Sequence, residues 1–450
     1  MSAIILPKII EQIGPNDLKK LLAVSPILAA TFAPIDDRVK INATIIKSQL
    51  PLNELTVIID HYNLYSNLKA IFSNCKILKL GFNASLPLFE LKDEDPYLKI
   101  FDIVEAFKLS FHISEYSARI LQYALASLAT KGNITPSIEE VILEVESRSQ
   151  ISIPKIHVAR LLRLLDLMSY GRIGAAFCNQ ANIDFTKNDT ILIIDVSHLP
   201  REFKTLASFL ILMKLPKDKK LTIIIENADL MMPELMRALR EEFALAFERT
   251  LYTLDILDQF RKSLIILSCR SPIFLSTRAR FKLKYAFASI PKYKEDFDAL
   301  VNIFLTSKIS WREIKNLPQN LMLIFQNGEL KTASLSFTKI PSIPITIEEK
   351  LKPHKIKIET LLEKVFRGLS EAAYQILSFL LQGSADRDTL LGYAIGILGL
   401  NSEKAQRILG ILSAYGLISD VIGRDGKHYL KITPSGIAAL NEYSSKEEYQ

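Results

Sequence analysis

Six short apolar runs limit the folds that this chain can adopt. Helical stretches separate them, and they cover residues 26–32, 55–60, 76–82, 191–196, 221–226 and 263–268. Their Ile, Leu and Val content is nearly continuous rather than alternating, which is typical of strands buried on both faces. Strands that alternate with helices predict a mostly parallel sheet with helices on both sides. We therefore expect an α/β fold.

Two segments interrupt this alternation. Residues 98–172 lack strand signals and have helical periodicity, which predicts an all-α insertion. Residues 320–339 are expected to form a hairpin around Asn327-Gly328, a pair favoured in tight turns. Prolines and charged residues follow this hairpin. They predict a linker at 346–366, after a first domain at 1–345.

The last part of the chain, residues 367–450, has the signals of a separate domain. Three helical segments come first. The strands LISDVI and KHYLKI then flank the turn residues 423–426, and Thr433-Pro434 opens a final helix. This order of elements predicts a winged helix-turn-helix domain, and it resembles the MarR/PadR-like group.

Composition and cysteine content exclude several classes of protein. Of 450 residues, 49% are hydrophobic and 23% are charged, which is typical of a globular chain rather than a disordered one. No apolar run approaches the roughly 18 residues of a membrane span, and no signal peptide is recognised. Cys75, Cys178 and Cys269 are scattered, and no metal-ligand spacing is present. We expect a soluble cytoplasmic protein without a metal or other cofactor.

The sequence lacks a recognisable phosphate-binding loop. Such a loop needs glycines and a Gly-Lys-Ser/Thr segment, and this segment occurs nowhere in the chain. After the first strand, residues 32–39 read FAPIDDRV, and Asp36-Asp37 would repel a triphosphate. Arg38 stands roughly where the lysine of the loop would be. We therefore expect no ATP binding of the usual kind.

The strand at 221–226 leads into residues that bear on the same question. It continues as TIIIENADLM, with Glu226, Asn227 and then Asp229. An amide such as Asn227 cannot take up a proton from water at neutral pH. Glu226 and Asp229 carry oxygen ligands that suit Mg²⁺, but without a phosphate cradle we favour a structural role for them.

The chain resembles the HerA/FtsK-type ATPases of archaea over residues 15–345. ILIIDVSHLP at 191–200 is similar to a strand of that family, and TIIIENADLM takes the place of the strand that ends in Asp-Glu. Arg261-Lys262 before SLIILSCRSP resembles the sensor strand, and LPQNLMLIF at 317–325 resembles a later strand. The resemblance implies a RecA-like P-loop fold and assembly into a ring.

The same resemblance implies that the chemistry is altered. Glu226 takes the place of a metal-binding Asp, Asn227 takes the place of the water-activating Glu, and Cys269 takes the place of the sensor Gln. We therefore expect a degenerate member of the family that does not hydrolyse ATP. Asp195, with Ser197 and His198, could suggest acid–base catalysis, but a helix cap is the favoured interpretation.

A long basic stretch follows the sensor strand. From Arg261 to Lys294 the chain has nine Lys or Arg residues and no Asp or Glu, with Phe and Tyr interleaved. This pattern predicts a surface that faces a polyanion. The alternative is the solvated face of an ordinary strand-and-loop segment. The candidate contacts in this stretch are Arg278, Arg280, Lys282 and Lys284.

The terminal domain is a second candidate for DNA binding. A winged helix lays its third helix in the major groove and its wing along the backbone. Residues 367–450 contain eight Lys or Arg against nine Asp or Glu, so a winged helix used for protein contacts stays an alternative. The side chains expected to contact double-stranded DNA are Lys404, Gln406, Arg407, Ser413, Arg424, Lys427 and His428.

Three functions follow from these observations. We favour an inactive HerA-like protein that binds double-stranded DNA as a regulator or structural component of DNA processing. The second is a divergent ATP-driven DNA translocase. The third is a non-catalytic subunit that joins the ring of an active HerA-type ATPase and lends Arg270 as an arginine finger. The expected protein partner is either a second copy of the chain, in a homo-oligomer, or such a HerA-type ATPase. None of the three involves a membrane.

Overall fold

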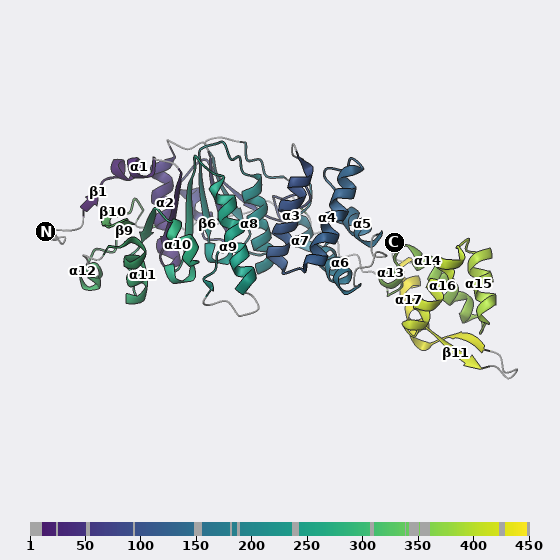
Figure 1. Ribbon diagram of the computed structural model, residues 1–450. Coiled ribbons are helices and arrows are strands. Elements are labelled where there is room, and N and C mark those ends of the chain that lie inside the picture. Colours follow the sequence, from purple (N-terminus) through teal and green to yellow (C-terminus); the bar gives the residue numbers. More distant parts are fainter. Residues whose placement is uncertain are drawn as a thin grey trace. The chain divides into compact units, whose positions relative to one another are not determined.

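The protein is described by a computed structural model, in which the chain divides into two compact units, Met1–Lys355 and Ile356–Gln450 (Figure 1). The described residues are 11–23, 26–50, 55–92, 95–147, 155–180, 182–186, 190–235, 243–306, 310–337, 339–341, 351, 361–422 and 428–447.

A ten-stranded sheet organises the first unit. Its strand order is β1-β10-β9-β8-β2-β7-β6-β3-β5-β4, and all neighbours from β8 to β4 are parallel. The antiparallel pairs are β8 with β9 and β9 with β10. The strands are β1 (Glu11–Ile13), β2 (Ile27–Phe32), β3 (Leu55–Asp60), β4 (Cys75–Lys79), β5 (Thr190–Asp195), β6 (Leu221–Glu226), β7 (Leu264–Cys269), β8 (Tyr285–Ala288), β9 (Leu321–Gln326) and β10 (Glu329–Ser334).

The expected parallel sheet is confirmed, with one strand shorter than predicted. Every residue of β3, β5, β6 and β7 is buried, as continuous apolar runs require. The run at 76–82 ends early, because β4 stops at Lys79. There the Asn83 side chain accepts a hydrogen bond from Lys79 N–H at 2.7 Å and donates one to Ile77 O at 3.1 Å. The predicted hairpin forms as β9 and β10, with Gly328 in a left-handed conformation.

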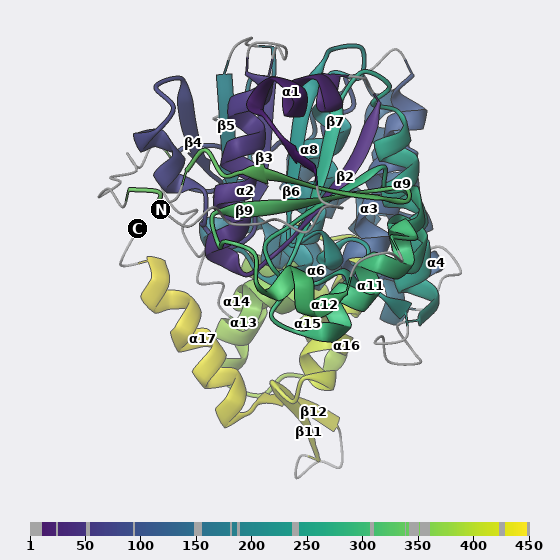
Figure 2. The same cartoon turned by 90° about the vertical axis from the view of Figure 1, so that its left-hand side faces the viewer.

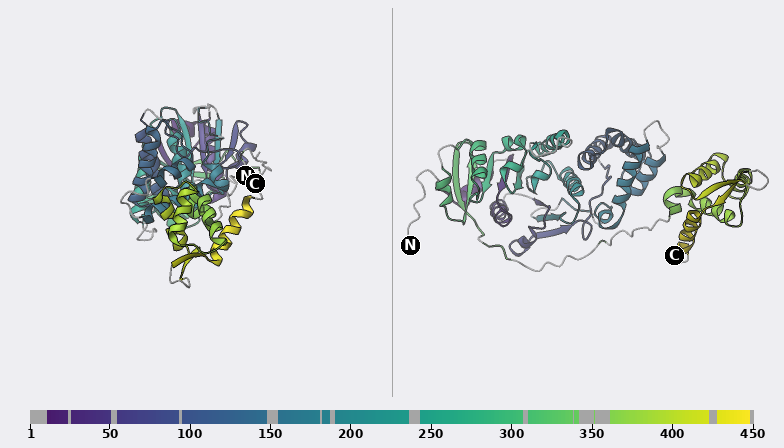
Figure 3. Two further views of the ribbon diagram at one scale, coloured as in Figure 1. Left: turned by 90° about the vertical axis from the view of Figure 1, so that its right-hand side faces the viewer. Right: turned by 90° about the horizontal axis from the view of Figure 1, so that it is seen from below.

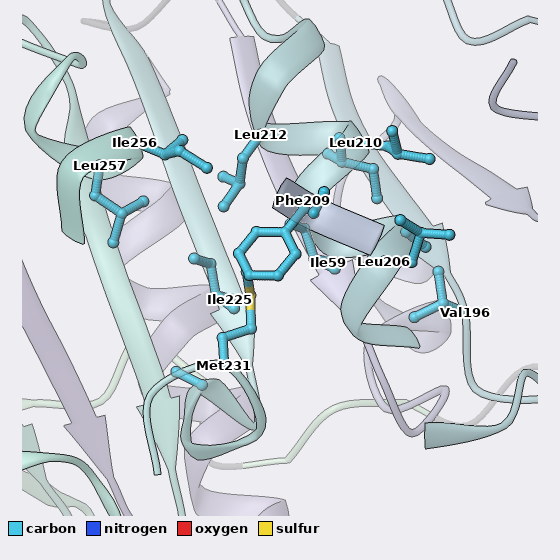
Figure 4. Close-up of a cluster of buried hydrophobic side chains, with 14 of the residues drawn as sticks. Ile59, Val196, Leu206, Phe209, Leu210, Leu212, Ile225, Met231, Ile256 and Leu257 are labelled. Atoms are coloured by element: carbon cyan, nitrogen blue, oxygen red, sulfur yellow. The ribbon is translucent and has the colours of Figure 1, made fainter. Parts of the chain in front are cut away.

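Helices cover both faces of the sheet, and alternate strand residues face them. Ile58 packs on the side of α1 and α2, whereas its neighbour Ile59 packs on the side of α8. Figure 4 shows the Phe209 ring of α8 directed at the sheet beside Ile225. The helices outside the insertion are α1 (Pro15–Ala23), α2 (Ile35–Gln49), η1 (Ser66–Ala70), α8 (Arg201–Lys214), α9 (Phe243–Asp258), α10 (Thr277–Lys282), α11 (Lys294–Phe304) and α12 (Trp311–Lys315).

The all-α insertion between β4 and β5 is also confirmed. Its helix α3 packs against α8, so the insertion extends the core on one face of the sheet (Figure 1). The helices are α3 (Pro96–Phe111), α4 (Glu115–Thr130), α5 (Ile138–Ser147), α6 (Lys155–Ser169) and α7 (Gly171–Ala176). Across the described parts of both units, no helix combines the length and the hydropathy that a membrane crossing requires.

The second unit has the predicted order of three helices, a hairpin and a final helix (Figures 2 and 3). One further helix, α13, lies in the segment where we expected a linker, and it packs against α14 and α17. Apolar residues at Leu362 and Phe366 bury it there. The elements are α13 (Leu361–Phe366), η6 (Arg367–Leu369), α14 (Ser370–Leu381), α15 (Arg387–Gly396), α16 (Ser402–Ala414), β11 (Ile418–Ile422), β12 (His428–Ile432) and α17 (Pro434–Glu447).

Gly436 of α17 packs closely against other residues of the second unit. A Cβ atom on Gly436 would lie 2.2 Å from Leu417 O and 2.8 Å from Ile432 Cγ1. Since the first neighbour is backbone, Gly436→Ala is expected to destabilise this unit by about 1–3 kcal/mol. Hydrogen exchange of the α16 amides in the full chain measures the change.

Gly410 in α16 provides the matched control. A Cβ atom there meets nothing within 4 Å, so Gly410→Ala should stabilise the helix by roughly 0.5–1 kcal/mol. Equal protection of the α16 amides in the Gly436→Ala variant and the parent would show that the close contact is not a constraint.

Candidate functional site

The parallel strands end along one edge of the sheet, which we call the carboxyl edge, and begin along the opposite, amino edge. The connection after β2 leads to α2 on one face, whereas those after β7 and β6 lead to the other face. Ligands of open α/β sheets bind where neighbouring connections diverge in this way. We therefore expect a ligand site at the carboxyl edge of β2, β7, β6 and β3.

The connection between β2 and α2 is too short to form a phosphate-binding loop. Only Ala33 and Pro34 separate the two elements. The Ala33 N–H already donates to Cys269 O at 3.3 Å, and proline has no N–H. Asp36 and Asp37 follow in the first turn of α2. This connection therefore offers a phosphate no unpaired amide and places two carboxylates next to it.

A buried ion pair lies behind this connection. Arg38 Nη1 of α2 is 2.7 Å from Glu226 Oε1 at the end of β6, and both side chains are almost fully buried. The Tyr65 hydroxyl donates to Glu226 Oε2 at 2.7 Å. Burial raises the pKa of Glu226, and the Arg38 guanidinium opposes that rise. Both Glu226 oxygens are thus engaged within the protein.

Further polar side chains extend this pair into a network that joins four elements. Asn42 of α2 donates to the Tyr65 hydroxyl at 2.7 Å and to Ser268 Oγ of β7 at 3.2 Å. Its Oδ1 accepts from the Thr31 hydroxyl of β2 at 2.7 Å. The predicted structural role of Glu226 agrees with this arrangement, because the carboxylate contacts Arg38 and Tyr65 rather than solvent.

Asn227 faces a different environment from Glu226. It has a left-handed conformation, with φ of 54°, and it lines a cleft of about 370 Å³ at the ends of β3 and β6. Arg201 and Lys204 of α8, together with Asp229, contribute charged groups to this cleft. The predicted pair Glu226 and Asn227 is therefore divided between a buried network and an open cleft.

Sequence reasoning missed the residues behind this cleft. Asp60 at the end of β3 accepts from the N–H groups of Tyr62 at 3.1 Å and Tyr65 at 2.9 Å, and burial raises its pKa to about 7. Burial lowers the pKa of His61 to about 4. Lys204 donates to His61 O at 2.9 Å. The signal in the sequence was the Asp-His pair that ends the apolar run at 55–60.

The other candidates at this edge have structural roles. The expected helix cap is not formed, because the N-cap of α8 is Pro200 and has no side-chain cap; Asp195 Oδ1 instead accepts from Ser197 N–H at 2.8 Å in the turn after β5. His198 lies edge-on to the Phe82 ring, and burial lowers its pKa to about 4. Cys269 is fully buried, and burial raises its pKa well above the usual value. Within the described residues, no group of three or more His, Cys, Asp or Glu side chains is arranged to hold a metal.

The structure divides the basic stretch between the two edges of the sheet. Arg270 lies at the carboxyl edge, at the end of β7, whereas Lys284 lies at the amino edge, where its N–H donates to Leu28 O. Arg280 pairs with Glu234 and Lys282 pairs with Asp258. Arg278 lies over the Phe247 ring at 4.6 Å. The basic stretch is therefore not one continuous surface, because β7 and the return through α10 carry the chain from one edge of the sheet to the other. Binding of a polyanion by its cations stays a prediction.

In the second unit, the candidate DNA contacts on α16 share one exposed face. Lys404, Gln406, Arg407 and Ser413 are exposed, and the opposite face packs into the core of the unit. In the hairpin, His428 is exposed, and its Nδ1 lies 3.1 Å from Asp420 Oδ1. The candidates Arg424 and Lys427 lie outside the described residues.

The buried ion pair leads to a test of stability. Arg38→Met leaves the Glu226 carboxylate without its counter-charge and is expected to cost roughly 3–5 kcal/mol. Because the pKa of Glu226 would then be raised further, the loss should grow as the pH rises. Guanidinium denaturation followed by the fluorescence of Trp311, the single Trp of the chain, measures it in the first unit.

Two further variants make this test specific. The double variant Arg38→Met/Glu226→Gln removes both charges and should recover part of the lost stability. Lys20 pairs with Asp17 on the surface, where its side chain is 82% exposed, so Lys20→Met should leave the midpoint unchanged. A double variant as unstable as Arg38→Met would argue against the ion pair as the cause.

Comparisons with known proteins support the fold. No family model matches the chain, and no curated protein matches it in sequence. Among solved structures, VirB4 of Thermoanaerobacter pseudethanolicus is similar, with a TM-score of 0.54 and 13% identity, over 71% of this chain and 90% of that chain. The bacterial conjugative coupling protein TrwB has a TM-score of 0.49 and 10% identity, over 76% of this chain and 96% of that chain.

The likeness to VirB4 shows the fold alone. The large mostly parallel sheet, with helices on both faces, matches the RecA-like fold that we expected. The narrower resemblance to archaeal HerA proteins stays a prediction, and so does the winged-helix assignment of the second unit.

Proposed function

We propose that this protein is a non-hydrolysing relative of the P-loop ATPases that binds double-stranded DNA through its second unit. It acts in this proposal as a regulator or structural component of DNA processing. The RecA-like fold is retained for its rigid sheet, and the nucleotide site is replaced by structural contacts.

The observation that carries this proposal is the two-residue connection between β2 and α2. A P-loop uses several consecutive backbone N–H groups to hold phosphates. Here Ala33 N–H is bonded to Cys269 O, and Pro34 has none to offer. Arg38, which stands roughly where the lysine of the loop would be, is buried against Glu226. Asn227, which lines the neighbouring cleft, cannot act as a general base.

The exposed face of α16 supports the DNA-binding part. Arg407 and Gln406 are side-chain types that read base edges by paired hydrogen bonds, and both are exposed on this helix. Lys404 lies near the start of the helix, where Asn401 Oδ1 accepts its backbone N–H at 2.8 Å. Its side chain can reach a phosphate of the same groove.

A second candidate function rests on Arg270. This exposed residue lines a small cavity of about 160 Å³ at the carboxyl edge, together with Lys292 and the β2–α2 connection. An arginine in such a position could reach a nucleotide held by a neighbouring subunit. The protein would then be a non-catalytic member of a ring that contains an active ATPase.

The missing phosphate cradle predicts the absence of nucleotide binding. Titration of the full chain with Mg-ATP up to millimolar concentration should give no heat of binding by calorimetry. Adenosine without phosphates serves as the control for contacts with the base alone. A saturable heat that depends on the phosphates would overturn the proposal in favour of a divergent ATP-driven translocase.

The α16 face predicts salt-dependent binding to duplex DNA that does not require ATP. Gln406→Ala/Arg407→Ala should lower duplex affinity by about tenfold or more, because paired contacts to a base contribute roughly 1–3 kcal/mol each. Lys20→Ala, which removes an exposed cation from the first unit, is the matched control. Fluorescence anisotropy with labelled duplexes measures both. Equal affinity of all three proteins would exclude α16 as the DNA-reading helix.

A further inference from the structure

Three connections that are distant in the sequence meet at the amino edge of the sheet. They precede β6, β7 and β8, which lie in the sheet in the order β6-β7-β2-β8, and they cover residues 217–220, 261–262 and 282–284. We call these residues the basic edge. With the intervening Asp218 and the nearby Asp258, they contain seven Lys or Arg against two carboxylates. The first segment lies outside the basic stretch that the sequence singles out.

Contacts hold the first two segments of the basic edge together. The Ser263 hydroxyl donates to Lys219 O at 3.4 Å and accepts from Leu221 N–H at 3.3 Å. Lys217 Nζ lies 3.8 Å from the centre of the Phe260 ring, and burial lowers the pKa of this side chain to about 7, so Lys217 contributes less charge than its neighbours. In the third segment, Lys282 pairs with Asp258 at the end of α9. Neighbouring strands are about 4.8 Å apart, so the edge from β6 through β7 and β2 to β8 spans roughly 15 Å.

Helix dipoles do not account for this charge. Cations stabilise the C-terminal turn of a helix, and Lys214 and Lys282 occupy such turns. Lys220 lies six residues after the end of α8 and Arg261 three residues after the end of α9, outside the last helical turns in which that effect operates. Among the described residues, no carboxylate forms an ion pair with Arg261, Lys262 or Lys284. Their charges are therefore available to an external polyanion.

An exposed aromatic side chain lies at the same edge. Phe281, next to Lys282 in the last turn of α10, is 78% exposed. A phenylalanine in water gains nothing from exposure, and a ring flanked by cations is typical of surfaces on which unpaired bases stack. Duplex bases are already stacked and offer no free face.

From this juxtaposition we propose that the basic edge binds the phosphates of a single nucleic-acid strand, and that Phe281 stacks on one of its bases. The proposal rests on the proposed nucleic-acid binding and adds a site separate from α16. The cations supply affinity without reading sequence, since phosphate contacts are the same for every base. The stacking contact supplies the preference for an unpaired strand.

The experiment measures binding of the full chain to labelled oligothymidylate at several salt concentrations. The variant Lys220→Glu/Arg261→Glu/Lys262→Glu should lose at least tenfold in affinity. Each lost phosphate contact lowers the salt slope by about 0.7 for a single strand, so the slope should fall by about 2. Phe281→Ala should weaken this binding by about tenfold and duplex binding by less than twofold.

The opposite edge provides the matched control. Arg270→Glu/Lys292→Glu/Lys294→Glu reverses three exposed cations of the same basic stretch at the carboxyl edge and should change oligothymidylate affinity less than twofold. A milder set, Lys220→Gln/Arg261→Gln/Lys262→Gln, should lower the slope in the same way and guards against misfolding of the Glu variant.

The outcomes separate this inference from the proposed function. If the charge-reversal variants at the two edges lose oligothymidylate affinity equally, the basic edge is not a single-strand site. The same conclusion follows if heparin competes fully for binding and Phe281→Ala binds oligothymidylate like the parent. Loss of duplex binding only in the α16 variant, with oligothymidylate binding lost only in the basic-edge variant, supports both sites. An α16 variant with unchanged duplex affinity overturns the proposed DNA reader and leaves the basic edge to be judged on oligothymidylate.

Discussion

The buried ion pair between Arg38 and Glu226 determines how the centre of this sheet is used. Both charges are shielded from water, and removing one of them would cost far more free energy than the buried pair itself costs. The ion pair therefore fixes α2 against the end of β6 and draws Tyr65 and Asn42 into the same network. The ends of the central strands are therefore part of the protein's own packing in this region.

The separation of two neighbouring residues follows from the same constraint. Glu226 is the last residue of a buried strand, and its side chain is directed to α2. Asn227 then takes a left-handed conformation, which asparagine tolerates better than most residues, and lines the cleft beside Arg201 and Lys204. Glu226 thus stabilises the buried network, whereas Asn227 lines an open cleft.

Much of the fold could be predicted from the sequence, because burial on both faces leaves a continuous apolar signature. The runs at 55–60 and 221–226 coincide with β3 and β6, and the face of α16 follows from helical periodicity. The candidate site was harder to predict from the sequence. Nothing near Arg38 indicates that its partner is Glu226, since only the strand order brings them together. The basic stretch from Arg261 to Lys294 was hard to interpret for a similar reason, because the sequence does not show at which edge of the sheet each cation lies.

The short β2–α2 connection also limits how such a protein could change over generations. A P-loop motif occupies about eight residues, so no exchange of single residues within Ala33-Pro34 could create one. An insertion would be needed, and it would displace the Ala33 contact with Cys269 and shift α2 relative to Glu226. Intermediates on that route would carry an unpaired buried charge before any nucleotide could bind. A phosphate-binding loop could therefore not arise at this connection by exchange of side chains alone.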